Sequence, residues 1–441
     1  MANIYVNTKN ITGKIKPMHA VNNGPVHPDI EATRSSFDDF KAAKIPYVRT
    51  HDSSIYEEYG GEHVVDVHAI FPDFSKNPYN PDSYDFTLTD DYLHTIVEAG
   101  SSVFYRLGSK IEPWRKKYGT IVPSDFHKWA VICEHIIRHY NEGWANGFNY
   151  NIIYWEIWNE PDGVKEDGTK PNWSGTPEDF YEFYSIAAAY LKSRFPNLKI
   201  GGPAVCGFAE NGKWTKDFLR YLTADGKRIP LDFFSWHSYT NNPQCIREFQ
   251  SFVRKNLDDA GYTETESILN EYNYLENFQD KFVSSIENII GMHGAALTSA
   301  CMAVGQNISL DLLMYYDTSP SVFNGLFDFY TMRPLKGYYP FVMFSYLYEL
   351  QNAVECCSDD EDIYAVAAEN NGNSALMITH YRADKLNIEK TVKITLEGIK
   401  DNVYQAMFLN RELTMERRPV YVENGTFSLD LWDDSVVLVK F

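Results

Sequence analysis

Two glutamates stand where a carboxylic acid could act on a glycosidic bond. Glu160 ends a β-branched and aromatic run, 151–158, that passes into Asn-Glu-Pro, and proline stops strand pairing there. Glu271 directly follows a second short apolar run, Ser-Ile-Leu-Asn. A carboxyl group at a strand end, beside an asparagine and two indole rings, has the chemistry of a proton donor facing a sugar. The alternative for Glu160 is a glutamate that only caps a turn.

Strand geometry excludes Glu156, the other prominent glutamate, as the partner of Glu160. Side chains of one parity share a face of a strand, so Tyr154, Glu156, Trp158 and Glu160 are expected on the same face. Glu156 and Glu160 would then lie about 13 Å apart at roughly 3.3 Å per residue. A retaining glycosidase needs its two carboxyl groups about 5–5.5 Å apart. The second carboxylate must therefore come from another strand, and Glu271 is available.

The elements that would position these residues alternate along residues 13–351. Short apolar runs are separated by helical patterns, which is typical of βα units and a parallel sheet. The run order and the lack of an early Gly-rich phosphate motif favour a (β/α)₈ TIM barrel over a doubly wound sheet. The eight predicted strands are 15–21, 47–50, 102–106, 151–158, 199–202, 231–236, 267–270 and 310–315.

Residues 352–441 change to alternating strands and polar turns without helical periodicity, which predicts a C-terminal β-sandwich accessory domain. Its predicted strands are 363–368, 374–381, 390–396, 403–410 and 435–441. Residues 1–12 form a separate segment, and we expect the strand 3–6 within it to pair with the sandwich.

Local signals place several helix ends. Thr176-Pro177-Glu178-Asp179 reads as a capping box with proline at the first helical position. Ser124 is a predicted N-cap and Pro340 a predicted helix start. The polar loop 162–175 has the length of a lid. His135 and His139 lie off the apolar stripe of their helix and do not form an H-E-x-x-H motif, so we expect them at the surface.

Composition limits the possible partners. The 441-residue chain has a formal net charge of −20, which disfavours a nucleic acid or an anionic membrane as partner. The first residues contain no apolar signal core and no run of about 18 apolar residues occurs, so a cytoplasmic location is expected unless a signal was removed. The six cysteines are expected to be reduced core residues. No pattern demands a metal or another cofactor, and a homo-oligomer stays open.

At this point the chain resembles clan A of the glycoside hydrolases, and family 39 in particular. The segment 154–161 carries the resemblance to the clan. Arg49-Thr50-His51 after the second predicted strand and the His-x-Tyr of 237–239 at the sixth narrow it to the family, together with Glu271 at the seventh. The resemblance implies a barrel with a trailing sandwich, a small oligosaccharide or glycoside as substrate, and a retaining exo-acting mechanism. Glu160 would be the acid/base and Glu271 the nucleophile.

The resemblance also implies roles for the neighbouring polar residues. Asn159 would bind the sugar 2-hydroxyl, and for Asn159 and Glu160 both to face the ligand the strand must break its pleat. His51 would contact a sugar hydroxyl. Arg49 would lie beside the carboxylates and keep Glu271 ionised; its alternative is a purely structural ion pair with Glu156.

His237 and Tyr239 share a parity, which suits contacts with the sugar and the nucleophile. Their alternative is hydrogen bonding in the core. Aromatic rings are candidate stacking platforms for a pyranose, and the candidates are Trp158, Trp236, Trp173 and Trp114; the alternative for each is a place in the core or in the wall of the site. The clan places a tryptophan at strand eight, where this chain has Tyr315 and Tyr316; either tyrosine could replace that ring, and Tyr315 is the candidate named for the site.

A basic group follows the third predicted strand: Arg106, Lys110, Arg115, Lys116 and Lys117. A solvated helix start explains it, and contact with a carboxylate-bearing sugar is the sharper hypothesis.

The sequence thus predicts an exo-glycosidase that removes β-linked xylose or a related sugar. The alternatives are an arabinosidase, glucosidase, galactosidase or uronidase on the same scaffold, and a carbohydrate-binding protein that does not hydrolyse. Carboxyl groups held well beyond about 6 Å would favour the last alternative.

Overall fold

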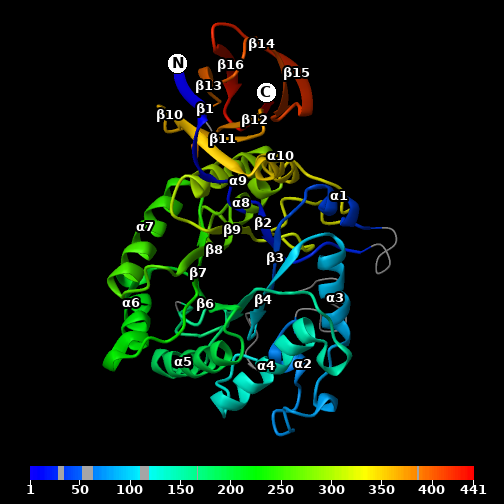
Figure 1. The fold of residues 1–441 in the computed structure, drawn as a ribbon, viewed down its shortest axis with the longest axis vertical. Helices are drawn as coiled ribbons and strands as arrows, with labels where there is room; N and C mark the ends of the chain where they lie inside the picture. The colour runs from blue at the N-terminus through cyan, green and yellow to red at the C-terminus, as the bar shows by residue number, and fades with distance from the viewer. Residues whose placement is uncertain (28–33, 52–62, 110–118, 166, 385–386) are drawn as a thin grey trace.

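A closed barrel of eight parallel strands forms the centre of the molecule (Figure 1). The computed structural model describes residues 1–27, 34–51, 63–109, 119–165, 167–384 and 387–441. The barrel strands follow one another in chain order: β2 (Ala20–Asn22), β3 (Tyr47–Thr50), β4 (Ser102–Leu107), β5 (Tyr154–Ile157), β6 (Lys199–Val205), β7 (Phe233–Tyr239), β8 (Glu266–Asn273) and β9 (Leu312–Tyr315). The predicted TIM barrel is confirmed.

Helices surround the barrel in Figure 1. Their bounds are α1 (Phe37–Ala42), α2 (Val67–Ile70), α3 (Thr87–Glu98), α4 (Phe126–Glu142), α5 (Pro177–Arg194), α6 (Ala209–Thr223), α7 (Gln244–Asp259), α8 (Phe282–Ile289), α9 (Met292–Gln306) and α10 (Tyr338–Leu350). The described residues also include the short 3₁₀ turns Pro81–Ser83, Trp144–Asn146 and Ala224–Gly226.

The remaining strands form a second sheet of nine strands in the order β15-β14-β17-β12-β11-β10-β1-β13-β16. It is one continuous sheet that curls around its own apolar core until β15 and β16 come into contact. Its strands are β1 (Ala2–Lys14), β10 (Asn352–Ser358), β11 (Ile363–Asn370), β12 (Asn373–His380), β13 (Glu389–Glu397), β14 (Asn402–Leu409), β15 (Thr414–Val422), β16 (Thr426–Trp432) and β17 (Ser435–Lys440).

The N-terminal strand β1 lies inside this sheet, antiparallel to β10 and parallel to β13. Both chain termini therefore lie in the sheet, at the top of Figure 1, with α9 and α10 between it and the barrel. Polar contacts join the two parts, because Ser299 in α9 bonds to Thr379 in β12, and His293 Nδ1 lies 2.7 Å from Asp434 Oδ1.

Capping explains several helix boundaries. At α5, Thr176 Oγ1 accepts a hydrogen bond from Asp179 N, and Asp179 Oδ2 accepts one from Thr176 N, so the predicted capping box is confirmed. At α4 the N-cap is Asp125, one residue after the predicted Ser124, and its side chain accepts from Lys128 N. Helix α10 begins two residues before the predicted Pro340.

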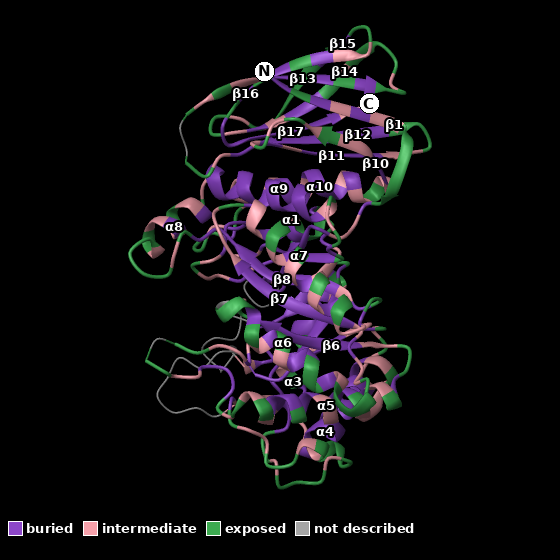
Figure 2. Ribbon diagram, turned by 90° about the vertical axis from the view of Figure 1, so that its left-hand side faces the viewer, coloured by how far each residue is buried: buried purple, intermediate pink, exposed green. Residues whose placement is uncertain are grey.

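The expectation for His135 and His139 is wrong, since both are buried. His139 lies between Trp144 O and Asp90 Oδ1 and stacks on Phe86. Figure 2 shows α4 buried over much of its length. The single apolar stripe understated this burial because α4 packs against neighbouring segments on more than one face. The cysteine expectation also holds only in part: all six are free, but Cys206 and Cys357 are exposed.

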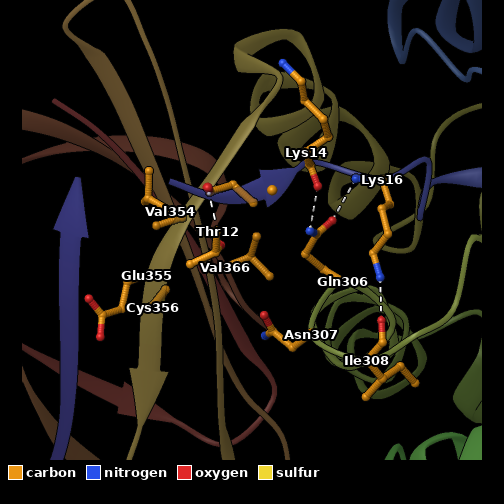
Figure 3. Close-up of a pocket in the computed structure, with 13 residues that line it drawn as sticks. Thr12, Lys14, Lys16, Gln306, Asn307, Ile308, Val354, Glu355, Cys356 and Val366 are labelled. Carbon is orange, nitrogen blue, oxygen red and sulfur yellow. Dashed lines mark hydrogen bonds between the residues drawn. The ribbon is translucent and has the colours of Figure 1, made fainter. Parts of the chain in front are cut away.

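A groove of about 530 Å³ lies where the sheet meets the C-terminal end of α9 (Figure 3). Lys16 Nζ donates to the backbone oxygens of Gly305 and Ile308, so it caps α9 from the groove wall. Burial lowers the pKa of Lys16 to about 8. None of the predicted site residues lines this groove, which we interpret as part of the joint between the two parts.

Among the described residues, no helix combines the length and the apolar character that a membrane crossing requires.

Candidate active site

Glu160 lies just beyond the carboxyl end of β5, where the backbone leaves the strand conformation. Trp158 and Glu160 have φ angles of +75° and +48°, in the left-handed region. This is the break in the pleat that the sequence predicted for Asn159 and Glu160. Glu160 N donates to Ala204 O at 2.9 Å, which fixes the turn to the end of β6.

Both carboxyl oxygens of Glu160 have neutral or titratable partners. His237 Nδ1 lies 2.7 Å from Oε1, and Asn172 Nδ2 donates to Oε2 at 2.8 Å. The Glu160 side chain keeps 18% of its surface exposed. Glu160 is thus held in place yet open to the barrel mouth.

Glu271, near the carboxyl end of β8, has stronger donors. Arg49 Nη1 donates to Oε1 at 2.7 Å and Tyr239 Oη donates to Oε2 at 2.8 Å. His51 Nε2 lies 3.5 Å from Oε1. Burial by itself would raise the pKa of Glu271, but the charges of His237, His51 and Arg49 and the Tyr239 hydroxyl lower it to about 2. Glu271 is therefore an ionised carboxylate.

The two glutamates face each other across His237. One ligand atom from each of Glu160, His237 and Glu271 lies within 4.8 Å of the others. His237 Nδ1 is also 3.5 Å from Glu271 Oε2. Burial would lower the pKa of His237, but the neighbouring carboxylates Glu271 and Glu160 raise it. One carboxyl oxygen of Glu160 and one of Glu271 thus lie within 4.8 Å of each other, an approach that suits a retaining pair.

Arg49 pairs with Glu156, as its structural alternative proposed, and also with Glu271, so the pair is not purely structural. Arg49 is fully buried, and its Nε donates to Glu156 Oε2 while Nη1 donates to Glu271 Oε1, each at 2.7 Å. Its Nη2 donates to Asn159 Oδ1 at 2.7 Å, which leaves the Asn159 amide nitrogen as the hydrogen-bond donor. One guanidinium therefore serves the ion pair beneath the site and the site itself.

Glu156 belongs to the layer below, as the strand arithmetic required. It is fully buried, and Oε1 accepts from Ser235 and Asn270. Beneath this polar layer the barrel interior is apolar, filled by Phe104, Phe233, Ile268, Leu312 and Met314.

Three aromatic assignments need correction. Trp236 alternates with His237 on β7, so its fully buried ring faces the helices and packs on Phe208 and Phe249. The positive φ of Trp158 turns its indole beneath the loop, where Nε1 donates to Asn172 O. Neither ring is placed to stack on a sugar.

The strand-eight position belongs to Tyr316 rather than Tyr315. Tyr315 is buried, and its hydroxyl donates to Phe323 O, away from the carboxylates. The Tyr316 ring lies 5.5 Å from the His51 ring and 6.4 Å from the Tyr239 ring. The alternation of strand faces explains the exchange.

Arg106, the first residue of the basic group, is not available for contact with a ligand. Arg106 is not at a solvated helix start; it is buried at the end of β4 and bonds to Asp66 and to His51 O. Although burial would raise the pKa of Asp66, the Arg106 guanidinium lowers it. The other members, Lys110, Arg115, Lys116 and Lys117, and the predicted platform Trp114 lie outside the described residues.

Sequence reasoning missed three neighbours of the site. Asn172 lies on the loop after β5, Asn22 accepts from Arg49 Nη1, and Asp162 accepts from Cys206 N. Burial, together with the charge of Glu160, raises the pKa of Asp162 to about 7. No spacing or motif points to these contacts, because each joins residues that lie 12 or more positions apart in the sequence.

Two groups of described residues place histidine and carboxylate atoms within metal-ligand distance: Glu160, His237 and Glu271, and His63, Asp66 and His68. In the first group His237 Nδ1 already lies 2.7 Å from Glu160 Oε1, and an ion there would occupy the space between the carboxylates. In the second group Asp66 already pairs with Arg106 and His63. Neither group needs a metal to explain its geometry.

Comparisons with known proteins find similarity to glycoside hydrolases. The sequence profile of glycosyl hydrolases family 39 matches residues 4–278. A protein named β-xylosidase from Geobacillus stearothermophilus is 29% identical over 135 residues, which cover 30% of this chain but only 24% of that protein. A protein named α-1,4-L-rhamnosidase from Formosa agariphila is 23% identical over 39% of this chain and 38% of its own length.

A solved structure described as a glucosidase from Croceicoccus marinus superposes with a TM-score of 0.81 and 22% identity, covering 100% of this chain and 98% of the other. At this identity the superposition establishes the shared fold of barrel and second sheet.

Proposed function

Because the chain belongs to glycosyl hydrolases family 39, we propose that it is a retaining exo-glycosidase with Glu160 as the acid/base and Glu271 as the nucleophile. Its substrate would be a small oligosaccharide or glycoside that ends in a β-linked xylose or a related sugar. The observation that carries the proposal is the close approach of the two carboxyl groups, within 4.8 Å, at the carboxyl ends of β5 and β8.

The first step forms a covalent intermediate. A Glu271 oxygen bonds to the anomeric carbon as the glycosidic C–O bond breaks, and Glu160 gives its proton to the departing oxygen. The low pKa of Glu271, about 2, supports the nucleophile role, because the carboxylate is ionised before the sugar arrives. Arg49 and Tyr239 hold both of its oxygens and limit its rotation.

The second step releases the sugar with retention of configuration. Water adds to the anomeric carbon, its proton passes to Glu160, and the ester bond to Glu271 breaks. Asn159 donates its amide hydrogen to the sugar 2-hydroxyl, because Arg49 occupies its oxygen. His51 and Tyr316, which lie on the other side of Glu271, contact the sugar ring.

The choice of sugar rests on names of relatives that match only part of their length. The β-xylosidase favours xylose, and the α-1,4-L-rhamnosidase favours a second candidate, a glycosidase for another sugar on the same scaffold. Tyr316 in place of the clan's tryptophan changes one wall of the sugar site, so a different sugar is physically reasonable.

The test has two parts. A panel of nitrophenyl glycosides, with the product anomer followed by NMR, identifies the sugar and the stereochemistry. Glu271→Gly should then lose almost all turnover of the preferred aryl glycoside, and azide should restore it with a glycosyl azide of inverted configuration. Retained activity in Glu271→Gly, or a first-formed product of inverted configuration from the wild type, would refute the assignment.

A further inference from the structure

The loop between β5 and α5 returns to the acid/base through one residue, Asn172. Its side chain is fully buried and donates from Nδ2 to Glu160 Oε2 at 2.8 Å. Its backbone oxygen accepts from Trp158 Nε1, also at 2.8 Å. Asn172 therefore forms hydrogen bonds with the residues on both sides of Asn159, namely the Trp158 indole and the Glu160 carboxyl group.

Asn172 is held in this place by contacts that do not involve Glu160. The next residue, Trp173, packs edge-on against Trp158 at 5.1 Å and donates from Nε1 to Thr176 O. Lys170 Nζ donates to Gly175 O across the same loop. These contacts hold the loop in place, so the Asn172 amide keeps its position next to Glu160.

The two oxygens of Glu160 have different surroundings. Oε1 lies 2.7 Å from His237 Nδ1, which is itself 3.5 Å from Glu271 Oε2, so Oε1 is the oxygen beside the nucleophile. Oε2 faces away, toward the loop, and accepts the Asn172 N–H. Because the Asn172 N–H holds Oε2 toward the loop, Oε1 is directed toward His237 and the nucleophile.

We propose that Asn172 is a positioning residue for the acid/base, which holds Oε2 of Glu160 toward the loop and so directs Oε1, with its proton in the first step, toward the reacting sugar. This inference rests on the proposed function and adds a residue to it. In the first step Oε1 gives its proton to the departing oxygen, and in the second it takes one from water. The Asn172 N–H stays on Oε2 throughout and stabilises the carboxylate between the two steps.

The consequence is a selective effect on acid catalysis. A 2,4-dinitrophenolate leaves without a proton, whereas a phenolate or a sugar alkoxide needs one. Removal of the amide should therefore slow the first step for poor leaving groups and spare it for good ones. A residue that only braced the loop would slow both equally.

The experiment compares Asn172→Ala with Lys170→Ala. Lys170→Ala removes a hydrogen bond of the same loop without touching Glu160, which makes it the matched control. The probes are phenyl and 2,4-dinitrophenyl glycosides of the sugar that the nitrophenyl panel selects. For Asn172→Ala we expect kcat/KM to fall on the order of 10- to 100-fold on the phenyl glycoside and less than about threefold on the dinitrophenyl glycoside. Lys170→Ala should change both by less than about threefold.

The pH profile gives a second readout. A hydrogen bond to a carboxylate stabilises its ionised form, so the alkaline limb of kcat/KM should move to higher pH in Asn172→Ala. If the alanine variant fails to fold, Asn172→Ser, whose hydroxyl is too short to reach Oε2, takes its place. Equal losses on the two substrates, or no loss on either, would overturn the inference. If the wild type and Glu271→Gly behave as proposed while Asn172→Ala shows no selectivity, only this inference fails.

Discussion

Glu160 and Glu271 are the same residue type at the same end of the barrel, but their hydrogen-bond partners and their burial differ. Glu271 is held by a guanidinium, a phenol and a histidine and is almost fully buried. Glu160 is held by an amide and a shared histidine and keeps part of its surface open. The cation of Arg49 reaches Glu271 and Glu156 but makes no bond to Glu160 among those described.

These different partners allow one pocket to hold two glutamates, one as nucleophile and one as acid. The donors of Glu271 stabilise its charge and lower its pKa to about 2. The partners of Glu160 leave room for a proton, and Arg49 is directed elsewhere. The residues around Glu271, on β8, therefore stabilise a negative charge, whereas those around Glu160, after β5, allow proton transfer.

Replacement of Glu160 should produce the largest effect that separates the two glutamates. Glu160→Ala should lower kcat/KM on the order of 10³-fold for a phenyl glycoside and only slightly for a dinitrophenyl glycoside, because only the first needs a proton. Azide should then give a glycosyl azide of retained configuration, opposite to that from Glu271→Gly. Glu178→Ala, on the exposed first turn of α5, is the control. The same azide product from both variants would erase the proposed division of roles.

A second effect concerns the residues around Glu271. Tyr239→Phe removes the donor to Glu271 Oε2, and we expect kcat/KM to fall on the order of 10²-fold for good and poor leaving groups alike. Tyr315→Phe removes a hydroxyl that bonds to Phe323 O instead, and should cost little activity. A loss confined to poor leaving groups would place Tyr239 with the acid/base rather than with the nucleophile.

The pH profile should show the same contrast. A group whose folded pKa is lowered stays ionised as the pH falls, so Glu271 should remain a nucleophile well below 4.5, its ordinary value, and lose its charge only near 2. With a dinitrophenyl glycoside, kcat/KM should therefore hold as the pH falls through 4.5. Enzyme returned to neutral pH must recover its activity, which excludes unfolding. In Tyr239→Phe the acid limb should move upward, and a wild-type limb at or above 4.5 would contradict the lowered pKa.

The smallest effect concerns Asp162, two residues beyond Glu160. Its folded pKa is raised to about 7, so the folded state binds a proton that the unfolded state releases near 3.8. Its contribution to stability is therefore present below 3.8 and is lost as the pH rises from 3.8 to 7. Asp162→Asn, which keeps an oxygen acceptor for Cys206 N, should lessen the fall in Tm over this range.

The control for this prediction is Asp167→Asn on the same loop. Asp167 is exposed, and its hydrogen bond with Thr169 lowers its pKa. Its replacement should leave the fall in Tm between pH 3.8 and 7 unchanged. Equal Tm profiles for Asp162→Asn and the wild type would count against the raised pKa.

Local spacing predicted the parts of the structure that depend on the direction of side chains along one strand. The parity of β5 separated Glu156 from Glu160, and the parity of β7 put His237 and Tyr239 on one face. The same alternation should have excluded Trp236 and favoured Tyr316 over Tyr315. The structure places Trp236 in the core, its alternative in the sequence analysis, and Tyr316 rather than Tyr315 beside His51 and Tyr239.

The second sheet shows the limit of the same method. Its alternating pattern predicted five strands but missed β10, β15 and β16, and could not tell two packed sheets from one sheet that curls over its core. Closure depends on strand twist and on pairing between distant segments. Those quantities are not local.

The positions of the two glutamates at strand ends, the order of the barrel strands and the polar residues near the carboxylates could all be predicted from the sequence. They follow from residue type and from the alternation of side chains between the two faces of a strand. Only the tertiary structure decided that Arg49 bridges two layers, that Trp158 turns away from the sugar and that Asn172 reaches Glu160. Each depends on a left-handed backbone turn or on a contact between residues that lie apart in the sequence. The free energy of such contacts comes from the folded neighbours rather than from the local chain.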